Sequence, residues 1–114
     1  MSAATWTDTI PLRRDEIGMD LLVCYDVRTD TREGRRRLRR IAKVCEDYGQ
    51  RVQYSVFECS IDEALLARFL AQCRKIVNTD EDSLRIYRLR GGRNDAVTAI
   101  GRDGYIDFTA PLIV

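Results

Sequence analysis

The chain has 114 residues, of which 45% are apolar and 32% charged, the composition of a folded globular protein with a single core. Nineteen Lys and Arg residues balance eighteen Asp and Glu residues, so the net charge of +1 does not by itself indicate a partner. The absence of histidine excludes Ser-His-Asp and Cys-His catalysis and histidine-coordinated zinc.

The cysteines lie in apolar segments and show no CxxC spacing, which argues against a zinc ribbon or a thioredoxin-like redox site. We expect four reduced core thiols in a cytoplasmic protein, because free cysteine is often buried and disulfides are rare in reducing compartments. No apolar run approaches the roughly 18 residues of a membrane span, so no membrane partner is expected. The four cysteines are Cys24, Cys45, Cys59 and Cys73.

The N-terminal residues 1–18 are polar and lack the apolar stretch of a secretory signal. We interpret them as an extension that precedes one domain over residues 19–114. Within that domain, residues 93–114 form a C-terminal segment.

The apolar run 21–25 is short and rich in strand formers, which predicts a central strand. Thr29 or Asp30 is the expected N-cap of the helix that follows, with Glu33 in its first turn. Helical periodicity continues to Tyr48, and a C′ glycine is expected directly after it at Gly49.

Residues 50–59 alternate as a half-buried strand does, with Val52, Tyr54 and Val56 on one side. Phe57 breaks the alternation, so we expect a bulge or bend near residues 54–57 that divides this segment into two strands.

A second amphipathic helix is predicted over residues 63–77, with Ser60 or Asp62 as its cap. A polar turn at 78–82 then leads to a strand over 83–89, which the pair Gly91 and Gly92 ends.

Residues 93–109 show no clear period, and the apolar end 111–114 is a candidate strand. Pro111 disfavours an interior position, so this end is expected at a sheet edge, either on its own sheet or on that of a partner. The order of elements predicts an α+β fold, a ferredoxin-like βαββαβ sandwich with an antiparallel sheet and two helices on one face.

The first predicted helix carries a dense basic run with few acidic residues at i±4. On a helical wheel, five of its cations share an arc of about 100° opposite the apolar face. Such a row of charges fits a phosphate backbone, although a solvated face is the common alternative. The residues are Arg32, Arg35, Arg36, Arg37, Arg39, Arg40 and Lys43.

Asp26 directly follows the first predicted strand, a place where active-site groups often lie in α/β sheets. A single carboxylate is a poor Mg²⁺ site unless water and phosphate complete it, and a symmetric dimer would supply a second copy. An Asx turn or a helix cap is the structural alternative. Tyr25 and Ser55 could donate hydrogen bonds to phosphate, or be a core residue and a strand-surface hydroxyl.

Several segments in this order resemble the family of the second CRISPR-associated (Cas) protein, a small nuclease family of spacer acquisition. They are the run Leu22-Val23-Cys24-Tyr25-Asp26-Val27, the basic helix followed by Gly49-Gln50-Arg51-Val52-Gln53-Tyr54-Ser55-Val56-Phe57-Glu58-Cys59, the stretch Asp82-Ser83-Leu84-Arg85-Ile86-Tyr87-Arg88-Leu89, and the end Pro111-Leu112-Ile113.

The resemblance implies a homodimer in which the C-terminal strand is exchanged, and an integrase partner that the dimer bridges during spacer insertion. It also implies a Mg²⁺-dependent endonuclease acting on RNA or double-stranded DNA. The family's metal-binding aspartate corresponds to Asp26, and further catalytic positions correspond to Tyr25, Ser55 and Phe57.

Two other functions remain open at this point. The chain could be a non-catalytic scaffold that binds double-stranded DNA through its arginines, a contact that carries no base readout. It could also be an RNA-binding domain of the RRM kind, although such a module needs aromatic residues on its central strands, and Tyr25 and Tyr87 are the only ones available there.

Overall fold

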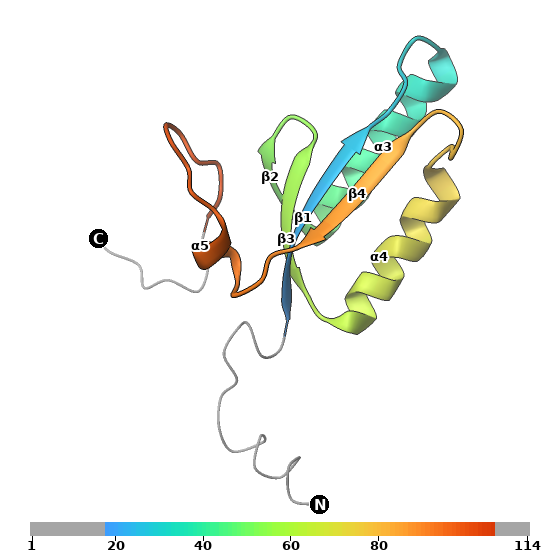
Figure 1. Cartoon of the computed structure of the whole chain (residues 1–114). Coiled ribbons are helices and arrows are strands. Elements are labelled where there is room, and N and C mark those ends of the chain that lie inside the picture. Colours follow the sequence, from blue (N-terminus) through green and yellow to red (C-terminus); the bar gives the residue numbers. More distant parts are fainter. Residues whose placement is uncertain (1–17, 107–114) are drawn as a thin grey trace, which may run out of the picture.

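A computed structural model describes residues 18–106 of the chain. Four strands form one antiparallel sheet in the order β2-β3-β1-β4, and α3 and α4 cover one of its faces (Figure 1). This confirms the expected ferredoxin-like α+β fold; the expected strand at 111–114 lies outside the described residues. The elements are β1 (Met19–Asp26), α3 (Arg32–Tyr48), β2 (Gly49–Gln53), β3 (Val56–Ile61), α4 (Glu63–Ile76), β4 (Ser83–Arg88) and α5 (Arg93–Ala96).

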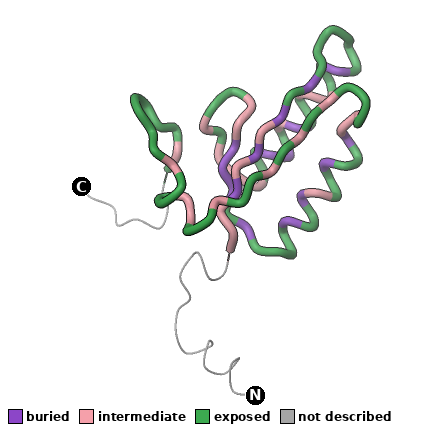
Figure 2. Tube along the Cα trace, viewed as in Figure 1, coloured by how far each residue is buried: buried purple, intermediate pink, exposed green. Residues whose placement is uncertain are grey.

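The core lies between the sheet and the two long helices (Figure 2). Alternation along β1 turns Leu21, Val23 and Tyr25 toward the helices. Ile41 from α3 and Phe69 from α4 meet them and are fully buried. Burial of one such side chain contributes about 1.5–3 kcal/mol, so this layer fixes which face of each strand is turned inward.

Helix α3 begins one or two residues later than the two expected caps predicted. Its N-cap is Thr31, whose hydroxyl accepts a hydrogen bond from the Gly34 amide at 3.0 Å. The expected caps, Thr29 and Asp30, were wrong, and the Asp30 carboxylate instead pairs with the Arg28 guanidinium at 2.8 Å. The cap is the residue whose side-chain oxygen reaches the first free helix amides, which only the path of the loop decides.

Gly49 ends α3, but not as the expected C′ glycine in a left-handed conformation. Its backbone is extended, with φ of −157°, and it starts β2. A Cβ atom there would lie 2.5 Å from the Cys59 sulfur and 2.6 Å from the Glu58 carbonyl oxygen. Close approach of two strands, and not a positive φ, is therefore what requires glycine at this position.

The segment after Gly49 is divided into β2 and β3, as expected. The register between these strands shifts between Arg51 and Gln53, slightly before the bend that the sequence placed at 54–57. Tyr54 is at the turn and 81% exposed, which corrects its expected place on a half-buried face.

Helix α4 is capped by Asp62, whose carboxylate accepts a hydrogen bond from the Leu65 amide at 2.8 Å, as the sequence predicted. It ends at Ile76, one residue before the expected end, and Val77 is its C-cap. The following turn and β4 lie where they were expected. Strand β4 ends at Arg88, one residue earlier than predicted.

Gly91 and Gly92 follow β4 with φ values of 74° and 88°. Residues with a Cβ atom rarely adopt such positive φ values, so the two glycines allow the chain to turn away from the sheet edge. The Leu89 amide donates to the Asp20 carbonyl at 2.8 Å, which keeps the turn close to β1.

The segment from α5 to Ile106 is attached to the face of the sheet that the helices leave open. Arg93 donates to the Glu58 carboxylate at 2.7 Å and to that of Asp103 at 2.6 Å. Glu58 is only 6% exposed, so its ion pair with Arg93 compensates for the hydration that the buried carboxylate loses. The side-chain amide of Gln50 binds both the amide and the carbonyl of Ile106, at 2.8 and 2.7 Å.

All four cysteines are free. The expectation of a core thiol is confirmed for Cys45, Cys59 and Cys73, which are buried, but it was wrong for Cys24, which is half-buried and lies outside the core. Burial raises the pKa of Cys45 and Cys59 to about 12 and that of Cys73 to about 11. These thiols therefore stay protonated and serve as small apolar side chains. Across residues 18–106, no helix is long and apolar enough to cross a bilayer.

Candidate functional site

Asp26 is the last residue of β1 and is exposed. It pairs through the backbone with Ser83 of β4. Since Tyr25 before it is turned into the core, alternation places the Asp26 side chain on the open side of the sheet. The sequence-predicted carboxylate is thus accessible to solvent at one end of the sheet.

Two other predicted site residues, Tyr25 and Phe57, belong to the core. Their rings stack with centroids 6.1 Å apart, and Phe57 is fully buried. Burial raises the pKa of the Tyr25 hydroxyl, an effect that the nearby Arg51 guanidinium partly offsets. The phenol is therefore neutral near pH 7.

Ser55 lies in the turn between β2 and β3 and is half-buried. Its carbonyl accepts a hydrogen bond from the Tyr25 amide at 3.2 Å. The register of β1 against β3, with Val23 opposite Phe57, brings Ser55, Tyr25 and Phe57 together. Asp26 is next to them in the chain but its side chain is turned to the other face.

Arg51 of β2 is a neighbour of this cluster that the sequence analysis did not single out. Its guanidinium carbon lies 5.1 Å from the centre of the Phe57 ring, a cation–π contact. Arg51 also pairs with Phe57 in the sheet register.

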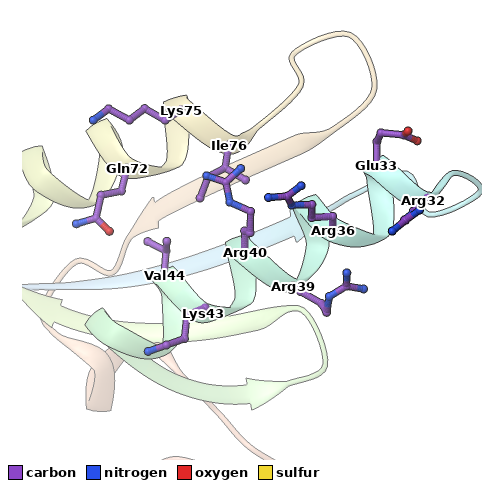
Figure 3. A pocket seen from close by; sticks show the side chains of 10 residues that line it. All are labelled: Arg32, Glu33, Arg36, Arg39, Arg40, Lys43, Val44, Gln72, Lys75 and Ile76. Carbon is purple, nitrogen blue, oxygen red and sulfur yellow. The ribbon is translucent and has the colours of Figure 1, made fainter.

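The basic run of α3 is divided between two roles. Five of its residues line a groove of about 980 Å³ between α3 and α4 (Figure 3). Lys75 and Gln72 of α4 lie on its other side, and Val44 and Ile76 also line it. Among the described residues, Glu33 is the one acidic residue along the groove. The five basic residues of α3 are Arg32, Arg36, Arg39, Arg40 and Lys43.

Arg37 points elsewhere and joins a structural network. It donates to the Asp82 carboxylate at 2.7 Å and to that of Glu81 at 3.2 Å. Helical spacing relates only residues three or four positions apart, whereas these two acidic partners lie 44 and 45 residues away in the chain. Arg35 is also engaged, through a hydrogen bond to the Thr29 carbonyl at 3.2 Å.

Lys43 has an acidic partner in its own helix, Asp47, at 2.6 Å. Four arginines of the groove have no acidic partner within the described part of the chain. The row of unpaired charge is therefore narrower than predicted. These four are Arg32, Arg36, Arg39 and Arg40.

A magnesium ion would find one suitable oxygen donor at the strand end. No three His, Cys, Asp or Glu side chains converge anywhere in residues 18–106. The carboxylates closest to Asp26 in the chain or the sheet, Asp30 and Asp82, already bind arginines. The donor type at Asp26 fits Mg²⁺, but one chain does not supply enough donors for a metal centre.

Sequence comparison now adds to this geometry. A sequence model of the family described as "CRISPR associated protein Cas2" matches residues 19–97. The chain belongs to the Cas2 family. This span contains β1, α3, β2, β3, α4 and β4, and with them Asp26 and the α3–α4 groove.

Individual Cas2 proteins are similar over most of the chain. A "CRISPR-associated endoribonuclease Cas2 1" of Moorella thermoacetica is 46% identical over 96 residues, 84% of this chain and 100% of the relative. A "CRISPR-associated endonuclease Cas2" of Halalkalibacterium halodurans is 44% identical over 95 residues, 83% of this chain and 99% of the relative.

The crystal structure of Streptococcus pyogenes Cas2 has the same fold, with a TM-score of 0.66 and 46% identity. The match covers 73% of this chain and 100% of that chain. Fold and family therefore agree.

Proposed function

We propose that the chain acts in CRISPR spacer acquisition as a homodimer that binds nucleic acid and cleaves RNA or double-stranded DNA with the help of a divalent metal ion. The observation that carries this proposal is the row of arginines on α3 that have no acidic partner among residues 18–106. The N-terminal end of this row joins the exposed Asp26 through residues 27–31. The names of the Moorella and Halalkalibacterium relatives support the nuclease part.

The arginines of α3 supply the nucleic-acid contact. Each guanidinium presents a planar fork of donors that matches a phosphate, and a cation without an acidic partner has no competing ion pair to break. Such contacts neutralise phosphates and release counterions, so binding weakens steeply with added salt.

The open face of the sheet supports the homodimer. Leu22 and Cys24 of β1 and Val56 of β3 alternate with core residues and so lie on the face away from the helices, where they are half-buried. An apolar strip of this kind is stabilised when a second copy covers it. The same proposal includes the exchange of the C-terminal strand between the two protomers. Residues 107–114, which contain that strand, lie outside the described range.

Asp26 and its copy in the second protomer would hold the Mg²⁺ ion. When bound, such an ion polarises a phosphodiester and supplies an acidic water for hydrolysis. The chain's own part is to hold a carboxylate at the end of a rigid strand. A shared site would explain why one chain offers a single donor there.

Tyr25, Ser55 and Phe57 shape the neighbourhood of that carboxylate. The stacked Tyr25 and Phe57 rings fix the end of β1 against β3, and the Ser55 hydroxyl in the turn can donate to a phosphate oxygen. Tyr25→Phe keeps the ring and removes only the phenolic hydroxyl, which separates its packing from any part in cleavage.

A scaffold without catalysis is the second candidate function. The observation in its favour is the lack of a cluster of metal-binding side chains within residues 18–106. In this form the dimer holds duplex DNA by its backbone and bridges the integrase. A cytoplasmic location is part of either version and is supported by the free, buried thiols.

The test compares Asp26→Ala with the wild type on RNA and duplex DNA as Mg²⁺ is titrated. We expect cleavage to be lost, because the metal loses its protein ligand, while metal-free duplex binding stays unchanged. Asp80→Ala is the matched control, since it also removes an exposed carboxylate, in the turn before β4.

Unchanged cleavage by Asp26→Ala would refute the nuclease site. Retained spacer acquisition by a variant that does not cleave would favour the scaffold. Combined reversal of Arg36, Arg39 and Arg40 to Glu should abolish binding in both versions, and binding that hardly responds to salt would contradict both.

A further inference from the structure

The turn between β2 and β3 carries an aromatic ring that the fold hardly uses. Tyr54 is the most exposed aromatic side chain among residues 18–106. Its chain neighbours, Gln53 and Ser55, are both polar. A ring that buries so little area contributes little to folding, and its flat π faces are open to a ligand.

The register of the sheet brings this turn to the same end as Asp26. The Tyr25 amide donates to the Ser55 carbonyl at 3.2 Å, which continues the antiparallel pairing of β1 with β3. Asp26 and Tyr54 are the next residues outward on the two segments, so both lie at this end of the sheet (Figure 1). A polynucleotide strand bound at Asp26 would therefore pass close to the exposed ring.

A guanidinium group lies near the same turn. The Arg51 guanidinium carbon is 5.1 Å from the centre of the Phe57 ring, and the side chain is 44% exposed. Its ion pair with Glu46 is long, at 3.7 Å. Burial is the main reason that the pKa of Tyr25 is raised, and the side chains of Arg51 and Tyr54 also act on that pKa. The polar groups of these three residues therefore lie close to one another.

The groups at this end of the sheet match the parts of one nucleotide. A tyrosine ring stacks on a nucleobase, and a guanidinium group binds a phosphate. A protein partner would need a buried apolar centre around the ring, whereas the ring has polar residues on both sides in the chain. In a duplex each base is already stacked on its neighbours, so a base reaches the ring when it is unpaired.

We propose that Tyr54 is a base-stacking residue that holds an unpaired nucleotide of the RNA or DNA substrate beside Asp26. This rests on the proposed nuclease function and adds to it the residue that binds the base. Stacking depends on the π face and not on charge, so the contact adds affinity without releasing counterions. It differs in this respect from the salt-dependent contacts of the α3 arginines.

The test compares three variants of this one position. Tyr54→Ala removes the ring, Tyr54→Leu keeps apolar bulk without a π face, and Tyr54→Phe keeps the ring without its hydroxyl. All three should fold, because the position is an exposed turn, and equal thermal unfolding checks this. The variants are made in the Asp26→Ala background and measured in EDTA, so cleavage does not enter the result.

The probes are labelled oligo-U and oligo-dT, abasic strands of the same length and a blunt-ended duplex DNA, measured by anisotropy over a salt titration. We expect Tyr54→Ala and Tyr54→Leu to weaken binding of a base-bearing single strand about tenfold, as for one stacked base. Tyr54→Phe should bind like the wild type. The base-bearing strand that responds, oligo-U or oligo-dT, identifies the sugar of the substrate.

The other probes serve as controls for charge. Binding of the abasic strands and of the duplex should not change in any variant. The slope of log affinity against log salt should also stay the same, because no phosphate contact is removed.

Unchanged binding of both base-bearing strands by Tyr54→Ala, or an equal loss on the abasic strands, would overturn the proposal. Wild-type affinity in Tyr54→Leu would do so as well, since it would show that apolar bulk suffices. A shift of Tyr54→Ala from dimer to monomer in light scattering would assign the ring to the interface between copies instead. The proposed function fails on separate evidence, namely if reversal of the α3 arginines leaves the binding of every probe intact.

Discussion

At the scale of single residues, Phe57 shows that packing can fix a position which the family resemblance predicts to be catalytic. It is fully buried, stacks on Tyr25 and carries Arg51 above its ring. Any change of its size disturbs the end of β1, where Asp26 lies. A loss of activity on its substitution therefore does not by itself identify a catalytic group.

We predict that Phe57→Ala lowers the free energy of unfolding by about 3–5 kcal/mol, because it leaves a cavity in the layer between sheet and helices. Urea denaturation measures this directly. Tyr54→Ala removes an aromatic ring that is 81% exposed and should change stability by less than about 0.5 kcal/mol. A stable Phe57→Ala variant that had lost cleavage would instead assign the ring a direct role.

At the scale of elements, the Asp82 carboxylate joins three segments that the chain order keeps apart. It accepts hydrogen bonds from the Arg37 side chain at 2.7 Å, the Arg28 amide at 3.2 Å and the Asn78 amide at 3.0 Å. Its side chain is 0% exposed. The start of α3, the loop after β1 and the turn before β4 are thus held together next to Asp26.

The same carboxylate makes the stability of the fold sensitive to acid. Burial alone would raise the pKa of Asp82, but the hydrogen bonds from Arg37, Asn78 and Arg28 outweigh it and lower that pKa below 3.8. The folded state then binds the proton less readily than the unfolded state. The contribution of Asp82 to stability is therefore complete above the pKa of the unfolded state. It is lost as the pH falls through the pKa of the folded state.

We predict that Asp82→Ala destabilises the fold by about 2 kcal/mol near neutral pH, because the backbone amides of Arg28 and Asn78 lose their acceptor. The difference from the wild type should shrink as the pH falls below 3.8. Denaturant unfolding over a pH series measures both effects. Asp80→Ala, in the same turn, should match the wild type throughout, and a gap that stayed constant with pH would contradict the assignment.

At the scale of the whole molecule, the sheet has two unlike faces. The helices seal one, and the other carries the apolar strip of Leu22, Cys24 and Val56 beside the anchored segment from Arg93 to Ile106. A four-stranded sheet with one face open to solvent is a suitable surface for a second copy.

We predict that Leu22→Asp converts a dimer into a monomer, since each association would bury two unpaired charges. Light scattering at several concentrations distinguishes the two states. Ala67→Asp introduces the same charge on the exposed side of α4 and should leave the dimer intact. A wild-type chain that is monomeric at all concentrations would refute the dimer proposal.

Local patterns were sufficient for the order of the four strands and the two long helices, because a few consecutive residues indicate each of them. The short helix α5 was not predicted, since residues 93–109 show no clear period. Asp62 was one of the two caps expected for α4, and the apolar run 21–25 correctly predicted β1 as a central strand. Positions that depend on a distant neighbour were not foreseeable in the same way. The cap at Thr31 follows from the path of the loop after β1, and the glycine at position 49 is required because Cys59 and Glu58 of β3 lie against it.

The same distinction between local patterns and distant contacts applies to the candidate site. The sequence alone identified a carboxylate at the end of a central strand and a cationic helix, because residues close together in the chain form each of these features. Tertiary structure alone decided that Arg37 is bound by Asp82 while Arg36 and Arg40 remain in a groove, and that Lys75 of another helix completes it. The reason is physical: side-chain type and period are local properties, but whether a charge is neutralised or free depends on which distant groups the packing of the core brings within hydrogen-bonding distance.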